Sequence, residues 1–124
     1  ADKKDCGKVD FAMTRVFWHK EAAAGGWARF SLEEQMANIG SEVGRAAKWQ
    51  DENISLFPGA VERALELFDL TLDDPRWKGK NDEIALAKEV FCDALSGGEE
   101  YGSTLTGLDA YFLPFAFASR RHAA

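Results

Sequence analysis

Four stretches of this chain carry apolar residues at helical spacing, with short connections between them, and this pattern constrains the fold most strongly. The first stretch begins with Ser31-Leu32-Glu33-Glu34, a capping box in which the serine hydroxyl and the Glu34 carboxylate satisfy backbone NH groups at a helix start. Apolar residues then recur every three or four positions as far as about Asp51. The pattern predicts a helix over 31–51 with one apolar face.

Three further helices are predicted from the same periodicity and from residues that favour helix ends. Their expected starts are marked by Pro58, by Asn81 or Asp82, and by Ser103 or Thr106, and their expected ends by Asp74-Pro75, Gly97-Gly98 and Arg121. Proline suits a first helical turn because its missing NH would be unpaired there, and glycine suits the residue just past a helix end. Helices with such short connections favour an antiparallel bundle.

A chain of 124 residues with 46% hydrophobic side chains is long enough for one domain with its own core. We therefore expect residues 1–124 to form a single all-α domain. Its architecture is predicted to be an antiparallel bundle of four main helices, with residues 1–30 as an additional N-terminal segment.

The chain is acidic, with a net charge of −6, and residues 31–75 hold most of the excess. An acidic surface repels phosphate backbones, so nucleic acid is not expected as a partner. The longest apolar stretch, residues 110–118, is too short to cross a bilayer, so no membrane association is expected. We expect a cytoplasmic protein. Of its two cysteines, Cys6 and Cys92, the second is predicted to be a buried thiol.

Four carboxylates on the second predicted helix share one stripe, because they are spaced by four, three and four residues: Glu62, Glu66, Asp69 and Asp73. Glu42 lies at the edge of the apolar face of the preceding helix. Carboxylates that face each other across a bundle can hold Mg²⁺, and a solvated acidic helix flank gives the same pattern. Both interpretations stay open at this point.

The segment from Ile39 to Arg45, together with the ExxD pair Glu66 and Asp69, resembles all-α nucleoside-triphosphate pyrophosphohydrolases of the MazG kind. The resemblance implies a Mg²⁺-dependent hydrolase with Glu42, Glu66 and Asp69 as metal ligands. The chain departs from the family pattern at Ser41 and Arg45, where further glutamates are expected.

Three segments also look like a family of short uncharacterised prokaryotic proteins, and the resemblance extends over most of residues 31–121. They are Ser31 to Trp49, Glu89 to Leu95 and Tyr101 to Leu105. This resemblance implies an all-helical fold and supplies no activity.

Small and apolar residues outside the main helical faces suggest self-association. Ala37, Gly40 and Gly44 form a small-residue stripe, which indicates that another backbone passes close to it. The predicted interface residues are Gly40, Gly44, Leu67, Leu70, Leu113 and Phe117. The leading hypothesis is a non-enzymatic interaction module that forms a homodimer and needs no cofactor. The alternatives are the Mg²⁺-dependent nucleotide hydrolase and a protein that binds a small apolar ligand between its helices.

Overall fold

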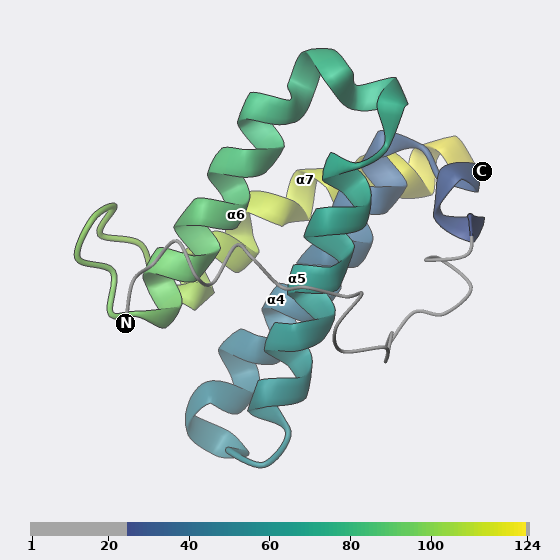
Figure 1. Cartoon of the computed structure of the whole chain (residues 1–124). Coiled ribbons are helices and arrows are strands. Elements are labelled where there is room, and N and C mark those ends of the chain that lie inside the picture. The colour runs from purple at the N-terminus through teal and green to yellow at the C-terminus, as the bar shows by residue number, and fades with distance from the viewer. Residues whose placement is uncertain (1–24, 124) are drawn as a thin grey trace.

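The computed structural model describes residues 25–123, and these residues form helices and connections without a strand. The predictions made for residues 1–24 lie outside the described part of the chain. The described elements are η1 (Gly26–Arg29), α4 (Leu32–Glu52), α5 (Phe57–Leu72), η2 (Pro75–Lys80), α6 (Asn81–Leu95) and α7 (Leu105–Ala123) (Figure 1).

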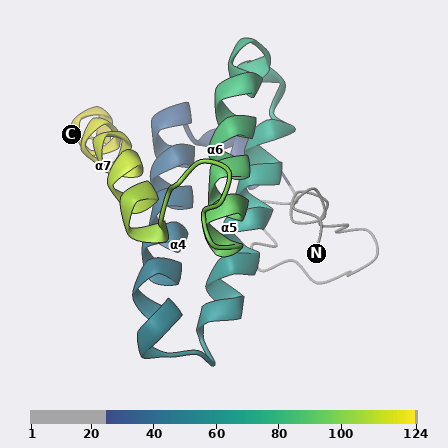
Figure 2. The same cartoon turned by 90° about the vertical axis from the view of Figure 1, so that its left-hand side faces the viewer.

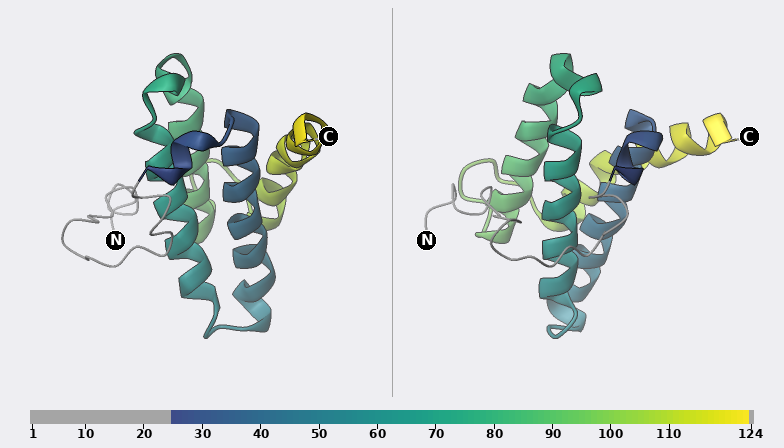
Figure 3. Two further views of the ribbon diagram at one scale, coloured as in Figure 1. Left: turned by 90° about the vertical axis from the view of Figure 1, so that its right-hand side faces the viewer. Right: turned by 45° about the vertical axis from the view of Figure 1, so that its right-hand side comes forward.

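The four long helices pack as a bundle. α4 and α5 form an antiparallel hairpin, and α6 lies beside α5 (Figure 2). α7 crosses α4, and its C-terminal part extends away from the other helices (Figure 3). The predicted all-α fold with four main helices is confirmed for the residues described. None of the described helices is long and apolar enough to cross a membrane.

The start of α4 has the predicted capping box. The Ser31 NH donates to Glu34 Oε1 over 2.9 Å, and the Glu34 NH donates to Ser31 Oγ over 3.2 Å. These bonds satisfy two backbone donors that a helix start leaves unpaired. The local sequence therefore determines where this helix begins.

A buried polar network joins η1, α4, the end of α5 and η2. Gln35, which is fully buried, donates from Nε2 to the Trp27 carbonyl over 2.9 Å and to Asp74 Oδ2 over 3.1 Å. Its Oε1 accepts from Trp77 Nε1 over 2.8 Å, and Trp27 Nε1 donates to Thr71 Oγ1 over 3.0 Å. Because a buried amide is costly unless it is hydrogen-bonded, this network holds the corner in one arrangement.

The connection after α5 is itself helical, which the sequence pattern did not predict. Asp74 caps η2 by accepting from the Arg76 NH over 3.0 Å. η2 runs directly into α6, so Lys80 is the residue before that helix and makes no side-chain cap. The predicted cap at Asn81 or Asp82 is wrong, because η2 already supplies the preceding turn.

The end of α6 and the start of α7 are set by turn residues. Gly97 and Gly98 have φ angles of 109° and 74°, a left-handed conformation that favours glycine, and the Gly98 NH donates to the Asp93 carbonyl over 2.8 Å. The predicted helix stop is confirmed. Thr104 Oγ1 accepts from the Gly107 NH over 3.0 Å, so Thr104 caps α7 in place of the expected Ser103 or Thr106.

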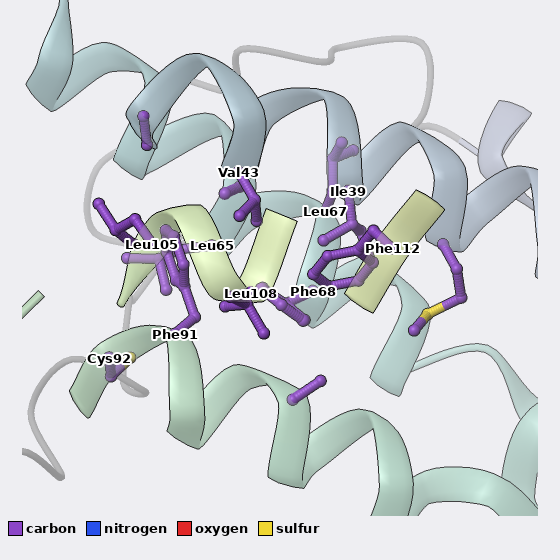
Figure 4. Packing of buried hydrophobic residues seen from close by; sticks show 14 of the residues in the cluster. Ile39, Val43, Leu65, Leu67, Phe68, Phe91, Cys92, Leu105, Leu108 and Phe112 are labelled. Atoms are coloured by element: carbon purple, nitrogen blue, oxygen red, sulfur yellow. The ribbon is translucent and has the colours of Figure 1, made fainter. Parts of the chain in front are cut away.

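The core lies where the four long helices meet (Figure 4). Phe68 of α5 is central to it, because its ring centroid is 5.8 Å from that of Phe91 in α6 and 6.2 Å from that of Phe112 in α7. Ile39 and Val43 contribute from α4 and are fully buried. The described residues thus share one continuous core.

Candidate functional site

α7 packs against the small-residue stripe of α4. A Cβ atom placed on Gly40 would lie 2.5 Å from the Cβ of Phe112, and one placed on Gly44 would lie 2.9 Å from Asp109 Oδ1. The prediction that another backbone passes close by is confirmed, and that backbone belongs to α7 of the same chain. Gly40 and Gly44 are therefore covered within one molecule, which corrects their interpretation as contact residues between two copies.

Two further predicted interface residues are also inside the molecule. Leu67 is only 2% exposed and belongs to the core, and Leu70 is partly buried against it. α5 is thus apolar on two sides because it is covered on two sides within the chain. Its position between α4 and α6 covers both sides without a second copy of the chain.

The last two predicted interface residues are exposed on α7. Leu113 is 53% exposed and Phe117 is 52% exposed, one helical turn apart. The guanidinium of Arg120 lies over the Phe117 ring at 5.6 Å from its centroid. We call Leu113, Phe117 and Arg120 the outer stripe of α7, because they follow one another at i, i+4 and i+7 along the helix. Leu113 and Phe117 are exposed, whereas Arg120 also borders α4.

A groove separates α6 from the first half of α7. It has a volume of about 420 Å³, and we call it the α6–α7 groove; its lining includes Glu83, Leu86 and Val90 of α6 with Gly107, Leu108 and Tyr111 of α7. Its walls are mainly apolar, and Leu86 and Tyr111 are exposed. The sequence pattern did not predict this site, although Leu86 lies outside the apolar face of α6 and is 48% exposed.

One polar contact spans the α6–α7 groove. The Tyr111 hydroxyl donates to Glu83 Oε1 over 3.1 Å. Burial of the ring and the neighbouring Glu83 carboxylate raise the pKa of Tyr111 to about 12. The tyrosine therefore stays a neutral donor at physiological pH, and Glu83 is the charged group that lines the groove.

The three predicted metal ligands do not form one cluster. Glu42, nearly buried, accepts from Arg45 Nη1 over 2.8 Å and from Arg63 Nε over 3.0 Å. The Glu42 carboxylate is thus already paired with two guanidinium groups, whereas a Mg²⁺ site needs its negative charge for the metal. Arg45, which already departs from the family pattern in the sequence, supplies one of these guanidinium groups.

The other two predicted ligands, Asp69 and Glu66, lie on α5. Asp69 pairs with Lys88 of α6, and burial raises the pKa of Asp69 while the lysine partly offsets this effect. Glu66 is fully buried in α5. Within residues 25–123, no group of three or more histidine, cysteine, aspartate or glutamate side chains is placed to hold a metal ion.

A second cavity lies between the first half of α4 and the last half of α7. It has a volume of about 270 Å³, and polar side chains such as Ser41, Ser119 and Arg120 line much of it, together with Ala37. α7 is therefore in close contact with α4 at Gly40 and less closely packed at Ala37. This divergence is what leaves the end of α7 projecting from the bundle (Figure 3).

Cys92 is 4% exposed on α6 and is disulfide-bonded. Its burial agrees with the prediction, but its expected state as a thiol is wrong. The chain contains one other cysteine, Cys6, which lies outside the described residues. Disulfides persist mainly in oxidising compartments, so the state of Cys92 does not support the expected cytoplasmic location.

Comparison of the chain with family models, with curated proteins and with solved structures finds no match. The two family resemblances noted in the sequence therefore stay predictions.

Proposed function

We propose that this protein is a non-enzymatic interaction module that acts as a homodimer, with the outer stripe of α7 as the contact surface. The observation that carries the proposal is that α7 is anchored on one side and leaves large apolar side chains exposed on the other. Phe112 is buried against Gly40, whereas Leu113 and Phe117 are each more than half exposed.

The physical argument is the removal of this apolar surface from water. Complete burial of a leucine or phenylalanine side chain contributes about 1.5–3 kcal/mol, and a symmetric dimer buries each residue twice. Leu113 follows the anchored residue Phe112, so the bundle holds this end of the stripe in place, and ordering of the projecting end around Phe117 is part of the cost of association. The net charge of −6 favours a protein partner over nucleic acid.

The test is the oligomeric state of the purified chain, measured by sedimentation equilibrium over a range of micromolar concentrations. We expect the wild-type protein to be a dimer and the Phe117→Asp variant to be a monomer. Ile54→Asp is the matched control, because Ile54 is 81% exposed between α4 and α5 and receives the same change. A wild-type chain that is monomeric at every concentration would refute the proposal.

Of the two alternatives, the contacts weaken the hydrolase, and one observation favours the ligand binder. The Mg²⁺-dependent hydrolase needs a carboxylate cluster, whereas Glu42 faces Arg45 and Arg63. The small-ligand binder is favoured by the volume of the α6–α7 groove, which falls in the range of ligand sites.

For location, the disulfide at Cys92 leads us to propose an oxidising compartment.

A further inference from the structure

The α6–α7 groove has a charged end and an apolar end. Among its described lining residues, Glu83 is the one that carries a charge at neutral pH, and the Tyr111 hydroxyl donates to its Oε1 over 3.1 Å. α6 continues from Glu83 toward Val90, and α7 starts near the end of α6 and reaches Tyr111 after Gly107. The carboxylate therefore lies at one end of the groove, and Val90 and Gly107 lie at the other.

The dimensions of the groove fit a compact small molecule. From Glu83 to Val90, α6 advances seven residues, which is about 10 Å at about 1.5 Å per residue. An extended peptide of about three residues already spans this length. The volume of about 420 Å³ lies in the range of small-molecule sites. These dimensions favour a single ring or a short branched chain over a peptide segment.

The charge at one end favours a cationic head group. A carboxylate can accept about four hydrogen bonds, and a primary ammonium group has three donors. Tyr111, whose pKa is raised to about 12, adds no negative charge and keeps donating to Glu83. Glu83 is exposed, so an ammonium group beside it keeps part of its hydration and escapes the cost of full burial. An anionic head group would be repelled there.

We propose that the α6–α7 groove binds a small primary amine with an apolar body, its ammonium group beside Glu83 and its body between Leu86, Val90 and Leu108. The groove and the exposed apolar residues of the outer stripe lie on different sides of α7, because successive residues turn by about 100° around a helix. The inference therefore does not rest on the proposed homodimer.

The test compares three probes that share one body and differ in the head group. They are 3-phenylpropylamine, the neutral 3-phenylpropan-1-ol and the anionic 3-phenylpropanoate. Each is titrated into the ¹⁵N-labelled full-length chain at neutral pH, and amide chemical shifts give both the affinity and the place of binding. We expect the shifts to centre on the groove, and the amine to bind about three- to fivefold more tightly than the alcohol, since an exposed ion pair contributes modestly. The anion should bind more weakly than the alcohol.

Two variants separate the head group from the body. Glu83→Gln should lower the affinity for the amine to that for the alcohol and leave the alcohol unchanged, because only the charge is removed. Leu86→Ser should weaken binding of both, because an exposed apolar wall is lost. Glu62→Gln is the matched control, since it neutralises an exposed glutamate on α5, and it should change neither affinity.

The same spectra show whether each variant keeps the fold. Equal affinities for the amine and the alcohol in the wild type would overturn the proposal, as would an absence of shifts at the groove. An equal loss of amine binding in Glu62→Gln and Glu83→Gln would also overturn it, because attraction to the overall negative charge would then explain the preference.

Discussion

Replacement of Gly40 by alanine tests the packing of α7 directly. The added Cβ would lie 2.5 Å from the Cβ of Phe112 and 3.1 Å from its Cγ. Non-bonded carbon atoms prefer about 3.5–4.0 Å, so the two helices must separate by about 1 Å. The Phe112 Cβ is attached to the backbone, so a rotamer change cannot relieve this contact.

The magnitude follows from two opposing effects. An alanine in a helix interior is favoured over glycine by about 1 kcal/mol. Overpacking of a core costs about 1–3 kcal/mol and occasionally more. Because Phe112 is buried and its ring packs with that of Phe68, we place the cost at or above the upper end. The expected result is a net loss of about 2 kcal/mol in the free energy of unfolding, or roughly 5–10 °C in Tm.

Gly44→Ala is the matched control, one helical turn away on the same face. Its Cβ would meet Asp109 Oδ1 at 2.9 Å, and this atom is the end of a side chain that can rotate away. The propensity gain then remains, and we expect a change of about 1 kcal/mol or less. Urea denaturation followed by circular dichroism measures both variants. If Gly40→Ala is as stable as the wild type, α7 does not pack against α4 as described.

Three further predictions concern charge, the disulfide and metal. Arg76 lowers the pKa of Asp74 to about 2, so this aspartate stabilises the folded state above pH 4 and loses its contribution as the pH falls from about 4 to 2. Because Arg76 is partly exposed, we expect this contribution to the free energy of unfolding to be about 1–2 kcal/mol. The Asp74→Asn variant should therefore lose less stability between pH 6 and pH 3 than the wild type. Thiol titration of the denatured, unreduced chain should find no free thiol, and reduction should lower stability by about 2–4 kcal/mol; a free Cys92 thiol would contradict the disulfide. Millimolar Mg²⁺ should leave the Tm unchanged, and a rise that Glu66→Gln abolishes would restore the metal-site alternative.

The projecting end of α7 links these predictions to the proposed function. Gly40 sets how closely α7 approaches α4, and the position of α7 in turn sets where Leu113 and Phe117 emerge. Gly40→Ala should therefore weaken the proposed dimer as well as the fold. Ile54→Asp, remote from this contact, should affect neither.

The candidate site was only partly accessible from the sequence. Leu113 and Phe117 stand out because they lie away from the main apolar face of their helix, and both are exposed. Leu67 has the same sequence signature and is buried, since α5 lies in the middle of the bundle. Periodicity reports which residues share a helix face, and it does not report how many neighbours cover that helix.

Local chemistry in the sequence determined that this chain is helical and where most helices begin and end. The Ser31 and Glu34 capping box and the stop at Gly97 depend on residues a few positions apart, so sequence reasoning finds them. Only the tertiary structure decided which helix occupies the Gly40 stripe, which partners neutralise Glu42, and that a groove opens beside Leu86. Each of these depends on residues that are distant in sequence, and their approach is set by the packing of whole helices.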